Sequence, residues 1–140
     1  MHAASASAAF RVVGAALAAS ILVAGVLALR TYDPNLQGNP ILPCLYHLFT
    51  DYFCPGCGAT RALHALVHFD LPRALSMNPL LVLLLPTMPA LVAWSRGWRP
   101  RVIAPVMRVV EQPGLWLVLI PCYWVARNLP WAPFSWMAPG

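Results

Sequence analysis

One uninterrupted apolar block constrains the fold of this chain more than any other feature. It runs from Val12 to Leu29 as VVGAALAASILVAGVLAL, with an arginine on each side. At ~1.5 Å of rise per residue, a helix of this block is ~27 Å long, which is enough to cross the hydrocarbon core of a bilayer. The block therefore predicts a membrane span over about residues 12–30. A cleaved signal peptide is the alternative, because Val26 and Ala28 stand where small residues precede a cleavage site.

The composition excludes a soluble globular protein. Hydrophobic residues make up 60% of the 140 positions and charged residues only 9%, whereas a soluble domain is roughly a quarter charged. This leaves too little polar surface to coat a soluble fold. We therefore expect residues 1–140 to form one all-α domain that passes several times through the bacterial cytoplasmic (inner) membrane, with the lipid bilayer as its main partner.

The positive net charge of +5 does not indicate nucleic-acid binding. All nine basic residues are arginines scattered along the chain, and the main cluster comprises Arg96, Arg99, Arg101 and Arg108. Short loops that carry positive charge tend to stay in the cytoplasm. The cluster therefore predicts a cytoplasmic loop, and we expect no nucleic-acid partner.

Two later apolar segments predict two further spans. Asn78-Pro79 is typical of a helix start, with Asn as the cap and Pro at the first helical position. The run that follows predicts a span over about residues 79–95, kinked by its two internal prolines. A third span is expected over about residues 114–130, followed by a tail rich in tryptophan that is typical of the membrane interface.

Between the first and second spans, residues 54–75 predict one amphipathic helix. At 100° per residue, Cys57, Arg61, His64 and His68 fall within a sector of about 60°. A stripe of this polarity disfavours a lipid-facing span, and an interfacial or re-entrant helix fits it better. Three spans then place the arginine cluster inside and the loop of residues 31–53 outside. Four spans are the alternative, in which residues 54–75 also cross.

The sharpest local motif is Cys-Pro-Gly-Cys-Gly-Ala-Thr-Arg at residues 54–61, with a further cysteine upstream. With this motif the chain resembles an uncharacterised family of small bacterial membrane proteins, a domain of unknown function marked by Cys-Pro-x-Cys-Gly-x-Thr-Arg. The resemblance covers roughly residues 40–130 and implies a family and a membrane location, but no activity. The positions that match the family pattern are Cys44, Cys54, Pro55, Cys57, Gly58, Thr60, Arg61, Asn78, Pro79, Arg127, Asn128 and Pro130.

The cysteines allow a structural disulfide or thiol-redox chemistry. A Cys-x-x-Cys pair at a helix start places one thiol near the positive end of the helix dipole, which lowers its pKa and makes it a nucleophile. Cys54 and Cys57 would then be the reactive pair and Cys44 the resolving partner. Outside the cytoplasm, a plain structural disulfide competes with this reading.

A metal site and a binding site are the other hypotheses. Cys44-x-x-His47 followed by Cys54-x-x-Cys57 supplies four ligands, the number that a tetrahedral zinc site needs. Thr60 and Arg61 at a helix start could instead hold a phosphate or carboxylate group, such as an anionic lipid headgroup, with Arg127 joining from the last span. Another membrane protein is the alternative partner. His64 and His68, one turn apart, are expected to be exposed interfacial residues.

No Gly-rich nucleotide loop, paired carboxylates or Ser-His-Asp set is present. We therefore expect a non-enzymatic membrane component with a cysteine-stabilised extracytoplasmic site and no cofactor. A membrane thiol-disulfide oxidoreductase is the leading alternative, followed by a module that binds zinc or anionic lipid.

Overall fold

The computed structural model describes residues 2–36 and 44–138, and all regular structure within these ranges is helical. This confirms the all-α prediction. The elements are α1 (His2–Thr31), α2 (Leu45–Thr50), α3 (Ala59–Val67), α4 (Leu71–Met77), α5 (Pro79–Leu84), α6 (Thr87–Ser95), α7 (Ala104–Val110), α8 (Pro113–Ala126) and the 3-10 helix η1 (Phe134–Met137).

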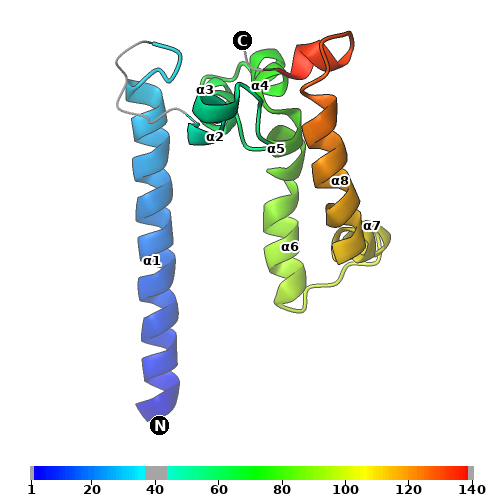
Figure 1. Ribbon diagram of the computed structural model, residues 1–140. Helices are drawn as coiled ribbons and strands as arrows, with labels where there is room; N and C mark the ends of the chain where they lie inside the picture. Colours follow the sequence, from blue (N-terminus) through cyan, green and yellow to red (C-terminus); the bar gives the residue numbers. More distant parts are fainter. Residues whose placement is uncertain (1, 37–43, 139–140) are drawn as a thin grey trace.

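The first helix, α1, contains the predicted first span. Its segment Ala9–Thr31 is long and apolar enough to cross a membrane, and none of its most apolar stretch is buried inside the chain. The helix joins the other elements at its C-terminal end, where the carbonyl oxygen of Leu29 lies 2.6 Å from Nδ1 of His64 on α3. One face of α3 therefore anchors α1, and the rest of α1 stands apart (Figure 1).

The prediction of one amphipathic helix over residues 54–75 is wrong, because two short helices, α3 and α4, replace it. Phe69 has a φ of 62° in the turn between them. Asp70 then caps α4 by accepting a hydrogen bond from the backbone N–H of Arg73 at 3.1 Å. Helices of this size are only ~14 and ~10 Å long. Neither can cross a ~30 Å hydrocarbon core, and this counts against the four-span alternative.

The second predicted span is also divided, into α5 and α6. Asn78 caps α5 with a 3.0 Å bond from the backbone N–H of Leu81, which confirms the predicted Asn-Pro start. The break falls at residues 85–86, where Pro86 precedes α6. The third predicted span corresponds to α8, which ends at Ala126 and meets α7 at an angle of 69°.

Among the described residues, length and composition identify one helix that could cross a membrane, or two if the bent pair α7–α8 counts as one span. Figure 1 shows α5 and α6 running away from the end of the molecule that carries α2, α3 and α4, and α8 returning to it. The C-terminal end of α1 lies at this same end. The packed core is there too: Ala62 and Ala65 of α3 meet Ala74 of α4 and Val82 of α5.

Candidate functional site

Three cysteines meet at this end of the molecule. Cys44 precedes α2, while Cys54 and Cys57 lie in the turn before α3. Sγ of Cys54 is 3.5 Å from Sγ of Cys44 and 2.9 Å from Sγ of Cys57, and all three sulfur atoms lie within 4.8 Å of one another. None of the three forms a disulfide. We refer to Cys44, Cys54 and Cys57 as the cysteine trio.

The turn at residues 54–57 keeps two of these sulfurs together through its own backbone. The N–H of Cys57 donates to the carbonyl oxygen of Cys54 at 3.1 Å, and the N–H of Cys54 approaches Sγ of Cys57 at 3.1 Å. Gly58 follows with a φ of 77°, a left-handed conformation that glycine adopts without steric cost. The predicted helix start at Cys54 is therefore wrong: α3 begins at Ala59.

Arg127, at the end of α8, donates hydrogen bonds to the backbone of the cysteine turn, residues 54–57. Its side chain is buried, with 1% of its surface exposed. Nη1 donates to the carbonyl oxygens of Cys54 at 3.2 Å and Pro55 at 3.3 Å, while Nη2 donates to the carbonyl oxygen of Met77 at 3.1 Å. The guanidinium also lies 5.3 Å from the ring centre of Tyr123. Because it is enclosed by protein groups, Arg127 cannot serve as the lipid-binding residue that its sequence position suggested.

Asn78 binds the same turn from the start of α5. It is 2% exposed, and its Nδ2 donates to the carbonyl oxygens of Pro55 at 3.1 Å and Cys57 at 3.2 Å. Its Oδ1 accepts from the hydroxyl of Tyr123 at 3.1 Å as well as from the backbone of α5. The amide is thus satisfied on both sides, as a buried polar group requires.

Asn128 is the third side chain that binds this segment, and it contacts Phe53, the residue before the turn. Its Oδ1 accepts from the N–H of Phe53 at 2.8 Å, and its Nδ2 donates to the carbonyl oxygen of the same residue at 2.9 Å and to that of Trp124 at 2.8 Å. We call Asn78, Arg127 and Asn128 the carbonyl clamp. Together they make six hydrogen bonds to the backbone of residues 53–57.

The surroundings of Cys44 and Cys57 shift the pKa values of these two thiols in opposite directions. Burial raises the pKa of the Cys57 thiol to about 12, and its side chain is 4% exposed. The backbone N–H of His47 is the main cause of a lowered pKa at Cys44. The redox hypothesis placed the low-pKa thiol within the Cys-x-x-Cys pair at a helix start. For Cys57 this prediction is wrong, because the helix begins after it and burial opposes its ionisation.

The other predicted ligand residues lie outside the trio. Nδ1 of His47 is 3.3 Å from the carbonyl oxygen of Tyr52, and its ring stacks on Phe53 at 4.5 Å. His64 is not an exposed interfacial residue, since it contacts the end of α1 and its Nε2 lies 3.7 Å from Oδ1 of Asp33. The exposed His68 bonds to the carbonyl oxygen of His64 at 2.9 Å.

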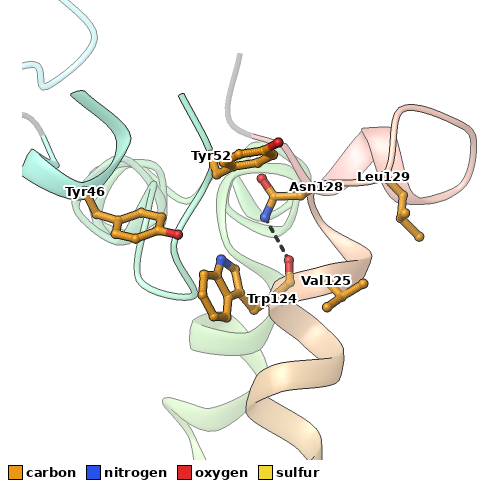
Figure 2. Close-up of a pocket in the computed structure, with 6 residues that line it drawn as sticks. All are labelled: Tyr46, Tyr52, Trp124, Val125, Asn128 and Leu129. Carbon is orange, nitrogen blue, oxygen red and sulfur yellow. Dashed lines mark hydrogen bonds between the residues drawn. The ribbon is translucent and has the colours of Figure 1, made fainter. Parts of the chain in front are cut away.

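Thr60 and Arg61, predicted to bind an anion, are half-buried on the first turn of α3, and Pro79 opens α5. Beside the clamp, the end of α8 and the segment around α2 enclose an open, largely apolar hollow of about 380 Å³ (Figure 2). The residues that line it are Tyr46, Tyr52, Trp124, Val125, Asn128 and Leu129.

The sequence reasoning missed Tyr123 and Phe53. Tyr123 stands four residues before Arg127, so one face of α8 carries both side chains, and this spacing was the available signal. Phe53 contributes its backbone N–H and carbonyl. No side-chain pattern reports such a contribution.

A family model matches residues 44–92 and is described as a protein of unknown function (DUF2752). No curated protein and no solved structure matches the chain. The matched segment contains the cysteine trio and Asn78, while Arg127 and Asn128 lie beyond its end. Residues 44–92 are therefore similar to an uncharacterised domain family, which supports the resemblance noted in the sequence.

Proposed function

We propose that this chain is a non-enzymatic, multi-pass component of the bacterial cytoplasmic membrane, with a structural cysteine site at its extracytoplasmic end. The observation that carries the proposal is the carbonyl clamp. Asn78 at the start of α5, and Arg127 and Asn128 at the end of α8, bind the turn that holds the trio. The site thereby ties two membrane-crossing segments to the cap formed by α2, α3 and α4.

Three segments supply the spans in this proposal: α1, the broken rod α5–α6, and α8 with its flanking residues. Residues 79–95 reach ~25 Å if the rod is nearly straight, close to the thickness of a hydrocarbon core. Figure 1 shows one end of each of the three segments at the end of the molecule that carries α2, α3 and α4. This arrangement supports three spans.

The distribution of charge supports an orientation. Three arginines, Arg96, Arg99 and Arg101, stand in the connection between α6 and α7, which Figure 1 shows at the end opposite to α3 and α4. Positively charged loops stay in the cytoplasm. The trio then faces the outside.

The raised pKa of Cys57 disfavours a redox enzyme in which this thiol is the attacking group. A thiol whose pKa lies near 12 is protonated at neutral pH, and the thiol form is a poor nucleophile. A thiol-disulfide oxidoreductase needs an accessible thiolate in its Cys-x-x-Cys pair. Burial of Cys57 opposes that requirement.

Labelling with a membrane-impermeant maleimide in intact cells tests the proposal. The experiment uses the Cys122→Ser chain, so that only the trio can react, and a Ser95→Cys reporter at the exposed C-terminal end of α6. We expect Cys44, which is half-buried and has the lowered pKa, to label from outside once cells are treated with a reductant and a chelator. The reporter should label only after the membrane is opened. Labelling of the reporter in intact cells, with the trio protected until lysis, would overturn the orientation.

A further inference from the structure

Arg127 is a buried cation without a carboxylate partner. The chain has four acidic residues, Asp33, Asp51, Asp70 and Glu111, and all four are among the described residues. Among the described residues, the groups that bond to Arg127 are backbone carbonyl oxygens, and no ion pair joins its guanidinium to any of these carboxylates. The Nε of Arg127 is also buried without a hydrogen-bond partner.

The guanidinium of Arg127 contacts carbonyl oxygens and aromatic rings, none of which carries a net negative charge. Moving an unpaired charge out of water costs free energy, so a buried charge is normally paired with an opposite charge or binds a metal ion. The groups that Arg127 contacts belong to the cysteine turn, the end of α4, Tyr123 and Phe53, all of which are neutral. A negative charge beside the turn would balance this cation.

The cysteine trio can supply that charge by binding a metal ion. Three thiols are neutral, and a disulfide between two of them is neutral as well. Three thiolates that bind one divalent cation carry a net charge of −1, which balances Arg127. Resting on the proposed structural role of this site, we infer that Cys44, Cys54 and Cys57 form a three-thiolate site for a zinc-class cation, with Arg127 as its buried counter-charge.

The positions of the sulfur atoms fit such a site. Tetrahedral zinc with Zn–S bonds of ~2.3 Å separates its sulfurs by ~3.8 Å. The observed 3.5 Å between Cys44 and Cys54 is close to this value, and the 2.9 Å between Cys54 and Cys57 reaches it by a small side-chain rotation. The backbone N–H beside Sγ of Cys57 suits a thiolate acceptor. Binding replaces the three thiol protons with the cation, and no electron is transferred.

The fourth coordination position is left to a small donor from solvent. His47, which sequence spacing suggests as the fourth ligand, stacks on Phe53 and bonds to Tyr52 instead. The site so defined has three protein sulfurs, in contrast to the closed four-ligand sites that hold most structural zinc ions.

Metal analysis of the full chain purified in detergent tests the inference. The reduced, metal-free chain is titrated with Zn²⁺ against a competing chelator dye, and with Co²⁺ for its thiolate charge-transfer absorption. We expect one Zn²⁺ per chain for the natural sequence and for the matched control Cys122→Ser. Loss of binding is expected in Cys44→Ser, Cys54→Ser and Cys57→Ser, and His47→Ala should retain it. Arg127→Met should weaken Zn²⁺ binding by about 10-fold or more, as removal of an outer-shell partner does.

The titration of the natural chain keeps the inference falsifiable even if a cysteine variant misfolds. Absence of Zn²⁺ binding to that chain, or of the cobalt–thiolate absorption, overturns the inference, as does unchanged affinity in Arg127→Met. Loss of binding in His47→Ala overturns the three-sulfur composition. If the trio labels from outside but binds no metal, this inference fails and the proposed function stands. If Zn²⁺ binds while the trio labels only after lysis, the proposed orientation fails instead.

Discussion

The guanidinium of Arg127 lies 3.2 Å, Nη1 to oxygen, from the backbone carbonyl of Cys54, a residue 73 positions earlier in the chain. The same nitrogen also reaches the next carbonyl, at Pro55. The conformation of the cysteine turn thus depends on the last long helix. A substitution at the end of α8 should therefore change the positions of the sulfur atoms of the trio.

Replacing Arg127 by methionine should destabilise the chain strongly. The change keeps an unbranched apolar stem but removes three hydrogen bonds donated by a charged group, while the carbonyl oxygens of Cys54 and Pro55 keep their bonds from Cys57 and Asn78. A hydrogen bond to a charged group contributes about 1.5–3 kcal/mol, so we expect a loss of about 3 kcal/mol or more in unfolding experiments in detergent. Arg108→Met, at an exposed position of α7, is the matched control and should change stability by less than about 0.5 kcal/mol. Equal losses in the two variants would contradict the clamp.

Asn128→Asp tests the clamp with an isosteric change. Nδ2 of Asn128 donates to two carbonyl oxygens, and a carboxylate at this position would instead repel both. We expect a loss of about 2–4 kcal/mol, since two bonds are broken and a charge is left beside acceptors. The exposed Gln112→Glu provides the control. An Asp variant as stable as the natural chain would show that Asn128 does not hold Phe53.

Gly58→Ala should cost stability whereas Gly114→Ala should not. Gly58 has a φ of 77° at the start of α3, and an alanine in the left-handed region costs about 1–2 kcal/mol. Gly114 lies in the first turn of α8 with open space around its Cα, and alanine there improves helix propensity by up to about 1 kcal/mol. Thermal unfolding of the pair gives opposite signs in this account. The same sign for both would mean that the turn tolerates a side chain.

Cys44 and Cys57 should react with an alkylating reagent at different rates when the chain is reduced and free of metal. At pH 8, iodoacetamide should modify Cys44 before Cys57, because the pKa of Cys44 is lowered and that of the buried Cys57 is raised to about 12. Alkylation of Cys57 should accelerate only as the pH rises toward that value, where its thiolate forms. Peptide mass mapping over time reads both rates. Faster modification of Cys57 at pH 8 would revive the redox hypothesis.

Local signals in the sequence predicted much of the helical framework. The apolar block of residues 12–30 and the start at Asn78-Pro79 need no distant contact to be recognised, and both correspond to helices of the structure. The break between α3 and α4 also had a local signal, because Asp70 and Pro72 form a capping pattern inside the predicted helix. The regular polar stripe of the segment outweighed that signal in the prediction.

The candidate site was predictable in its members but not in its arrangement. The family pattern singled out the trio together with Asn78, Arg127 and Asn128. The roles of these residues, however, depend on contacts between residues up to 75 positions apart. Arg127 looked like a residue for an external anion because it stands at the end of a predicted span, from which it could join Thr60 and Arg61. Its burial against three carbonyl oxygens depends on how α8 packs, which no spacing rule supplies.

Hydrogen–deuterium exchange of the purified chain in detergent tests most directly whether the clamp holds the cysteine turn. The N–H of Phe53 bonds to Asn128, that of Cys54 to a sulfur, and that of Cys57 to a carbonyl. Amides in such bonds exchange only when the structure around them opens. We predict that residues 53–58 exchange about as slowly as α3 in the natural chain, and much faster in Arg127→Met while α1 is unchanged. Exchange of residues 53–58 as fast as that of the connection between α6 and α7, in the natural chain itself, would contradict the account.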